Sequence, residues 1–211
     1  MRVNIGCGSL PTTGWKNYDN SLSIRIAHMG GIGRFIAAFL PSDQRSFVEF
    51  ARSHEVEYAD VVRRIPLPDE SVEVVYSAHM LEHLHPEQAR TCLQEVKRIL
   101  KPGGIIRLDL PDLELLVKDY LAHGDGNAFM EKSMLATPPI GGLFSKLRLT
   151  FTGFRHHLWM YDGRSLCRLL SECGYVDPQI TKPGMTRIPN PGPLDLAERA
   201  EQSVYVEAVK S

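Results

Sequence analysis

Residues 1–19 read MRVNIGCGSLPTTGWKNYD, and this stretch decides the fold that the sequence predicts. Arg2 to Ile5 is typical of a buried strand, Gly6-Cys7-Gly8 of a tight turn, and the residues ending in Asp19 of a second strand. Two glycines directly after a first strand let a ligand approach bare backbone, because neither carries a Cβ. An acid at the end of the next strand is placed to accept hydrogen bonds from a ribose diol. The stretch therefore predicts a nucleoside site at the carboxyl ends of a parallel sheet.

The turn differs from the G-x-G-x-x-G fingerprint of dinucleotide-binding proteins. In that fingerprint the third glycine lets a helix pack closely and present its N-terminus to a pyrophosphate. Here the third position is Pro11, and Gly14 interrupts the following residues. The turn therefore favours a nucleoside without a required phosphate, and S-adenosylmethionine is the common cofactor that fits.

Further motifs follow the turn in a fixed order along most of the chain. They are VNIGCG (3–8), GWKNYD (14–19), ADVVRRIPLPDESVEVVYSAHMLEHL (59–84), EVKRILKPGGIIRLDLPDLELL (95–116) and SVYVEAVK (203–210). In this combination the chain resembles the class I S-adenosylmethionine-dependent methyltransferases. It is most similar to a small branch of the type 11 group that starts with an (L/I)N(L/I)GCG strand. One departure is that the family's acid-rich G-x-G-x-G opening is reduced to N-I-G-C-G-S.

The alternation of expected strands and helices predicts an α/β fold with a doubly wound, mostly parallel, seven-stranded Rossmann-like methyltransferase sheet. A chain of 211 residues suits a single methyltransferase domain over 1–211, with inserted helices at 22–52 and a lid or substrate loop at 124–161. Apolar residues within the insert recur at helical spacing and predict a stripe that covers the sheet. A lid and a membrane-surface helix are the alternatives. The stripe comprises Ile32, Phe35, Ile36, Phe39 and Leu40.

Composition indicates an ordinary globular protein. Charged residues make up 23% and hydrophobic residues 43% of the chain, and the formal net charge is −1 without a long run of either sign. We therefore expect no general nucleic-acid binding. The four cysteines form no C-x-x-C pair and no leader precedes the first strand, which predicts reduced thiols in a cytoplasmic protein. No apolar run reaches the roughly 20 residues of a transmembrane segment.

The resemblance implies which residues contact S-adenosylmethionine. Asp19 would bind the ribose, the Asp60 carboxylate would face the adenine amine, and the Val61 backbone N–H would face a ring nitrogen. For Asp60 a role as a loop cap is the alternative. The residues after the fourth strand, Ser77 to His79, lie where a doubly wound sheet presents groups to its ligands. The expected cofactor-binding residues are Gly6, Cys7, Gly8, Asp19, Asp60, Val61, Ser77, Ala78 and His79.

Candidate residues for catalysis and acceptor binding lie mostly in the second half of the chain. His79 and His156 are the candidate bases if the acceptor is a hydroxyl. The segment from Lys146 to Arg164 contains four basic residues and one acidic residue, an excess that favours an anionic acceptor. Arg155, His157 and Tyr161 are the candidate acceptor-binding residues. The alternative is that His156 and Trp159 only pack the loop down.

The segment His79-Met80-Leu81-Glu82-His83 also matches the inverted zinc-peptidase motif H-x-x-E-H. On a helix its two histidines would share one face and could bind a metal. A buried strand precedes the segment, however, and Pro86 starts a new helix soon after it. We therefore expect no metal here and structural roles for Glu82 and His83.

These observations predict an enzyme, an S-adenosylmethionine-dependent methyltransferase that passes the methyl group in line to a small acceptor. Anionic and sugar-like compounds are the candidate acceptors, and relatives of the branch suggest a link to surface glycans by analogy. A non-catalytic module that binds S-adenosylmethionine as a sensor or to activate a partner is the alternative. A nucleic-acid amino-methylase is disfavoured, because the (D/N)PP(Y/F) motif is missing and Asp109-Leu110-Pro111-Asp112 does not replace it.

Overall fold

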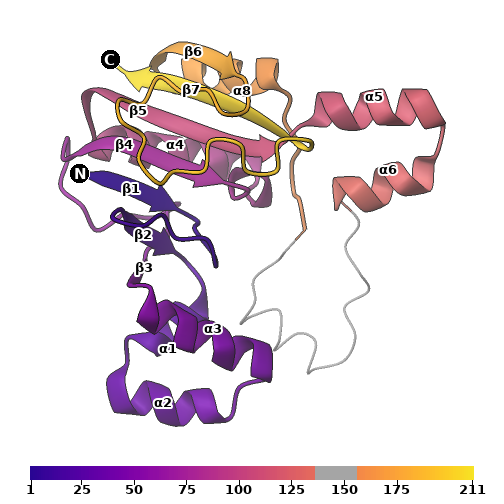
Figure 1. Ribbon diagram of the computed structural model, residues 1–211. Helices are drawn as coiled ribbons and strands as arrows, with labels where there is room; N and C mark the ends of the chain where they lie inside the picture. The colour runs from indigo at the N-terminus through magenta and orange to yellow at the C-terminus, as the bar shows by residue number, and fades with distance from the viewer. Residues whose placement is uncertain (136–155) are drawn as a thin grey trace.

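A computed structural model describes residues 1–135 and 156–211 and contains a seven-stranded sheet in the order β3-β2-β1-β4-β5-β7-β6 (Figure 1). Strands β1 to β5 run parallel, whereas β7 is antiparallel to both β5 and β6. The predicted fold class is therefore confirmed. The strands are β1 (Arg2–Ile5), β2 (Lys16–Asp19), β3 (Val56–Tyr58), β4 (Val72–Ala78), β5 (Leu100–Pro111), β6 (Tyr175–Thr181) and β7 (Ser203–Lys210).

The first strand lies inside the sheet and pairs with β2 on one side and with β4 on the other. The chain leaves β1 toward β2 and β3, then returns across the sheet to enter β4. The segments that follow β1 and β4 therefore depart in opposite directions. In open α/β sheets such a switch point leaves a crevice at the carboxyl ends of the strands, where ligands bind.

The two faces of the sheet are covered differently. Helices α4 (Pro86–Ile99) and α8 (Gly163–Glu172) pack on one face through buried apolar residues such as Leu93 and Leu166. The irregular segment 182–202 crosses the other face (Figure 1). Its residues Ile188 and Leu194 form an apolar cluster with Trp15 of the first loop and with the sheet.

The insert after β2 forms three helices beside the β3 edge (Figure 1). They are α1 (Leu22–Ala27), α2 (Gly30–Ala38) and α3 (Ser42–Ser53). The prediction that the apolar stripe of α2 covers the sheet is wrong, because Phe35 and Phe39 are 69% and 76% exposed. The helix packs instead through the buried Gly33 and Ala37. A Cβ at Gly33 would lie 2.0 Å from the carbonyl oxygen of Ile26, so a close backbone contact decides which face turns inward.

Helices α5 (Leu113–His123) and α6 (Gly126–Ser133) extend away from the sheet (Figure 1). The Asp112 carboxylate caps α5 by accepting from the Glu114 N–H at 2.9 Å, and Gly124 ends it with φ of 69°. The predicted lid loop therefore contains a helix in its first part, while residues 136–155 lie outside the described residues. Across the described ranges, every helix is too short or too polar to cross a membrane.

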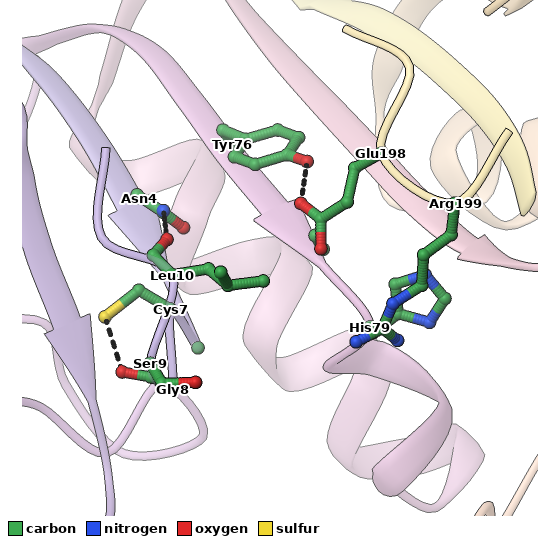
Figure 2. Close-up of a pocket in the computed structure, with 11 residues that line it drawn as sticks. Asn4, Cys7, Gly8, Ser9, Leu10, Tyr76, His79, Glu198 and Arg199 are labelled. Carbon is green, nitrogen blue, oxygen red and sulfur yellow. Dashed lines mark hydrogen bonds between the residues drawn. The ribbon is translucent and has the colours of Figure 1, made fainter. Parts of the chain in front are cut away.

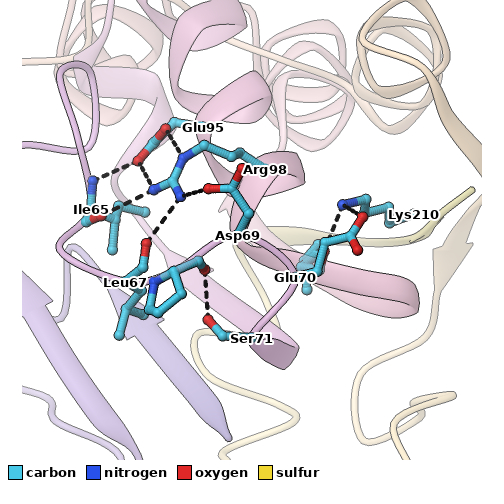
Figure 3. A network of polar contacts seen from close by, with 10 residues as sticks. Ile65, Leu67, Asp69, Glu70, Ser71, Glu95, Arg98 and Lys210 are labelled. Carbon is cyan, nitrogen blue, oxygen red and sulfur yellow. Dashed lines mark hydrogen bonds and ion pairs between the residues drawn. The ribbon is translucent and has the colours of Figure 1, made fainter.

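A polar network fixes the long connection that leads into β4 (Figure 3). The Arg98 guanidinium on α4 donates to the carbonyl oxygens of Ile65 and Leu67 at 3.1 and 3.0 Å. It also pairs with Glu95 and Asp69. One arginine thus satisfies the backbone of a loop that forms no regular structure, and it holds that loop against the helix.

A buried ion pair joins the sheet to the segment 182–202. The Arg107 and Glu207 side chains are both 0% exposed, and Nη1 of Arg107 lies 2.7 Å from Oε1 of Glu207. Arg107 also donates to the carbonyl oxygens of Met185 and Leu196. The Glu207 carboxylate accepts from the Arg187 backbone N–H at 2.8 Å. The pair therefore attaches the irregular segment to β5 and β7.

We expect Glu207→Ala to lower the free energy of unfolding by about 3–5 kcal/mol, because it leaves the Arg107 charge buried without its partner. The matched control is Glu57→Ala, which removes the exposed ion pair with Lys16 and should cost less than about 1 kcal/mol. Denaturant unfolding measures both. Equal effects of the two substitutions would show that the buried pair does not hold the segment.

Candidate functional site

A pocket of about 300 Å³ lies at the switch point between β1 and β4 (Figure 2). The glycine turn forms one wall, the end of β4 forms the floor, and Glu198 with Arg199 closes it from the segment 182–202. The lining residues are Asn4, Gly6, Cys7, Gly8, Ser9, Leu10, Tyr76, Ala78, His79, Glu198 and Arg199. The volume lies at the lower end of the range of small-molecule sites.

Two asparagines on neighbouring strands hold the loop that continues the glycine turn. Nδ2 of Asn4 donates to Oγ1 of Thr12 at 3.0 Å, and Oδ1 of Asn17 accepts from the Thr12 N–H at 2.7 Å. Gly6 has φ of 66°, and a Cβ there would lie 2.4 Å from Cγ of Met80. Gly6 is thus required by packing against the loop after β4, whereas Gly8 has open space on its Cβ side.

Asp19 connects the end of β2 to the glycine turn. Its carboxylate accepts from the Gly8 N–H at 3.1 Å and from the Ser21 N–H at 2.8 Å. Burial raises the pKa of Asp19, and the two backbone N–H groups oppose this by stabilising the anion. Each carboxylate oxygen keeps one further acceptor position, so Asp19 can shape the turn and still accept from a ligand.

The other predicted cofactor residues fall into two groups. Gly6, Cys7, Gly8, Ala78 and His79 line the pocket, whereas Asp19, Asp60, Val61 and Ser77 do not. Burial raises the pKa of the Cys7 thiol to about 12, so this wall is uncharged. Val61 is buried in the core. The Asp60 carboxylate accepts from the Val62 N–H at 3.1 Å, as expected if Asp60 caps the loop.

His79 stands at the end of β4 with φ of 47°, and both of its ring nitrogens face protein groups. Nδ1 lies 3.4 Å from Oε1 of Glu82. Nε2 lies 3.2 Å from Oγ of Ser203 and 3.7 Å from Oδ1 of Asp109. The geometry favours a residue that shapes the pocket wall over one that takes a proton from an acceptor.

The predicted acceptor-binding residues do not gather at the pocket in the described residues. Tyr161 is buried in the core, and burial raises the pKa of its hydroxyl to about 12. His157 is buried beside Glu82, and burial lowers the pKa of its imidazole. His156 contributes its backbone carbonyl oxygen, which accepts from Nδ1 of His83 at 2.9 Å. Arg155 lies outside the described residues.

Sequence reasoning missed Glu198 and Arg199. The hydroxyl of Tyr76 donates to Oε2 of Glu198 at 3.1 Å, and the hydroxyl of Tyr205 donates to its backbone carbonyl oxygen at 2.6 Å. Two tyrosines therefore hold the acid at the pocket. The sequence carries no local signal for this, because the segment 182–202 has no periodicity and only the antiparallel return of β7 brings it there.

Comparisons with known proteins agree with this fold. Residues 37–108 match the family model of the methyltransferase domain. The whole chain superposes on a SAM-dependent methyltransferase from Thermotoga maritima with a TM-score of 0.54 and 17% identity, covering 81% of that structure. For a SAM-dependent methyltransferase from Methanosarcina mazei the TM-score is 0.52 at 20% identity, with 99% of this chain and 91% of that chain covered.

Over residues 37–108 the chain thus matches the methyltransferase family, and its fold is that of S-adenosylmethionine-dependent methyltransferases. This confirms the predicted family and the predicted cofactor, S-adenosylmethionine.

Curated relatives of this chain carry a more specific name. The tRNA N(3)-cytidine methyltransferase METTL2 of Danio rerio is 30% identical over 97 residues, which are 41% of this chain and 26% of that protein. The same-named protein of Xenopus tropicalis is 27% identical over 148 residues, or 63% and 42%. The chain thus spans less than half the length of these relatives. The prediction of a small-molecule, glycan-related partner and of no general nucleic-acid binding is wrong, because these relatives are named for a tRNA substrate.

The pH dependence of stability reports on the buried acid behind His79. Burial raises the pKa of Asp109 from 3.8 to about 6. A carboxyl whose pKa is higher in the folded state contributes stability that is complete below the unfolded pKa and is lost as the pH rises through the folded pKa. We expect the free energy of unfolding to contain a component that falls between about pH 4 and pH 6.

Asp109→Asn should remove this component and flatten the pH profile of unfolding measured by denaturant titration. The exposed substitution Glu201→Gln is the matched control and should leave the profile unchanged. A wild-type profile without a fall in this window would contradict the assignment.

Proposed function

We propose that the chain binds S-adenosylmethionine in the pocket at the switch point and transfers its methyl group to a ring nitrogen of a nucleobase in RNA. The observation that carries the proposal is the position of this pocket between the glycine turn and the end of β4. Ligands of open α/β sheets bind at this place, and the family match supports S-adenosylmethionine as the ligand.

The residues around the pocket fit the parts of the cofactor. Arg199 and Glu198 bring opposite charges to one wall, which suits the carboxylate and ammonium of the methionine end. Asp19 sits against Gly8 at the end of β2, where an acid accepts from ribose hydroxyls. Asp60 and Val61 follow β3, and their proposed contact with the adenine remains a prediction.

The bound cofactor supplies an activated methyl group on a positively charged sulfur. The contribution of the chain is to align the two reactants, which is worth up to roughly 7–11 kcal/mol. Its walls also replace water around the reacting groups. The alignment relies on backbone held by Asn4, Asn17 and the tyrosine hydrogen bonds to Glu198.

The surroundings of His79 support an acceptor that needs no deprotonation before it attacks. Its nitrogens face Glu82 and Ser203, so in the described residues the pocket wall offers no free histidine nitrogen as a base. A pyrimidine ring nitrogen with a lone pair attacks without first losing a proton. The relatives named tRNA N(3)-cytidine methyltransferases are consistent with such an acceptor.

Substitutions at the proposed cofactor contacts should weaken cofactor binding by amounts that calorimetry can measure. Asp19→Ala removes a charged acceptor of hydrogen bonds, and we expect a loss of about 1.5–3 kcal/mol, or roughly 10- to 150-fold in Kd. Arg199→Ala should give a similar loss if the guanidinium binds the carboxylate of the cofactor. The exposed Glu57→Gln on β3 is the control. Tight NAD binding, or unchanged affinity in both the Asp19 and the Arg199 variant, would contradict the site.

The acceptor can be assigned by supplying cofactor labelled in its methyl group together with total RNA or with a metabolite extract from the same source. We expect the label in the RNA fraction, and in 3-methylcytidine after digestion to nucleosides. Label found only in small molecules would contradict RNA as the acceptor, whereas the proposed methyl-transfer activity would stand. Cofactor binding without label in either fraction would favour the non-catalytic module.

A further inference from the structure

Three potential metal ligands meet behind the pocket wall. Glu82 and His83 belong to the short 3₁₀-helix η1 (Leu81–His83) that follows β4. His157 is distant in the sequence and lies near the start of the second described range, 156–211. One ligand atom from each residue lies within 4.8 Å of the other two. The backbone joins the two segments, because the Glu82 carbonyl oxygen accepts from the Leu158 and Trp159 N–H groups at 2.7 and 3.1 Å.

The Glu82 carboxylate lacks the partners that a buried acid needs. The residue is 1% exposed, and neither carboxylate oxygen has a hydrogen-bond partner among the described residues. The nearest nitrogens are Nδ1 of His79 at 3.4 Å and Nε2 of His157 at 3.9 Å, beyond good hydrogen-bond length. A buried carboxylate without a partner is costly, which indicates that a cation belongs beside it.

The two histidines are oriented as metal ligands are. Nδ1 of His83 lies 2.9 Å from the His156 carbonyl oxygen, and Nδ1 of His157 lies 2.8 Å from the Ser133 carbonyl oxygen. Carbonyl oxygens only accept, so each ring must carry its proton on Nδ1. In the neutral imidazole, the form that binds metals, each Nε2 then keeps a lone pair. A backbone carbonyl that fixes the tautomer in this way is the usual outer partner of a metal-bound histidine.

We infer that Glu82, His83 and His157 bind a divalent transition-metal ion, with Zn²⁺ as the ion that best suits two imidazoles and one carboxylate. Zinc lies about 2.0–2.2 Å from such ligands, so tetrahedral ligand atoms are roughly 3.3–3.6 Å apart. Binding draws the three atoms together from their present separation by up to roughly 1.5 Å, which side-chain torsions can provide. At least one coordination position remains for water or another donor.

This site differs from the H-x-x-E-H reading of the sequence. In that reading the two histidine ligands are His79 and His83, which would share a helix face. The structure instead ends the strand at Ala78 and turns His79 toward Ser203 and Asp109. The second histidine comes from residue 157, which no local spacing could indicate. The expectation that the chain binds no metal is therefore replaced by this proposal.

The test is the metal content of the full chain after dialysis against chelator, addition of Zn²⁺ and removal of the excess. We expect one zinc per chain. Zn²⁺ at about a hundred times its Kd should raise the Tm by roughly 5–10 °C. Co²⁺ in the same site should give the intense visible absorption of a tetrahedral ion, which a surface histidine bound to solvated metal does not produce.

Glu82→Gln and His157→Gln should abolish the stoichiometric zinc and the Co²⁺ absorption. His83→Gln at the half-buried position gives a third variant in case the buried ones do not fold, with circular dichroism and cofactor binding as checks of folding. His54→Gln, at an exposed histidine on the C-terminal side of α3, is the matched control and should keep one zinc.

A wild-type chain without retained zinc would overturn the proposal, as would folded variants that retain zinc like the control. Neither outcome depends on methyl transfer, so the metal site and the proposed activity are tested separately.

Discussion

The arrangement of the site depends on the pairing of β1 on both of its edges. Because β2 and β4 occupy its two sides, the chain must leave β1 in one direction and re-enter the sheet from the other. The glycine turn and the residues after β4 are thereby placed opposite each other across a crevice. Met80 packs against Gly6 across it, so the same constraint selects glycine at the turn.

Two buried carboxylates of this fold have different surroundings. Glu207 faces Arg107 and accepts from the Arg187 backbone N–H, so the chain itself neutralises it and holds the segment 182–202 on the sheet. Glu82 is equally buried, yet in the described residues only rings at 3.4 Å or more approach it. The Glu207 carboxylate therefore contributes to the stability of the fold, whereas the Glu82 carboxylate still lacks a group that compensates its buried charge, as expected of a residue that binds a cation.

Those parts of the fold that rest on short-range chemistry could be predicted from the sequence. The Asp112 cap and Gly124 end of α5 are examples, as are the strand and turn that open the chain. What failed depends on contacts between distant segments. The periodicity of α2 could not reveal that Gly33 meets the Ile26 carbonyl oxygen, and no pattern placed Glu198 at the pocket. The histidine pair 156–157 suggested an anion-binding loop, whereas His157 turns inward to Glu82.

His79 links the two sites, because it lines the cofactor pocket while its Nδ1 lies 3.4 Å from the Glu82 carboxylate. A cation bound to the Glu82 carboxylate would neutralise the negative charge that now lies beside Nδ1 of His79. His79 would then depend more on Ser203 and Asp109 for its orientation, both of which contact Nε2. The φ of 47° limits the backbone's freedom to follow. The metal site and the cofactor pocket therefore share one side chain, the His79 imidazole, as their common wall.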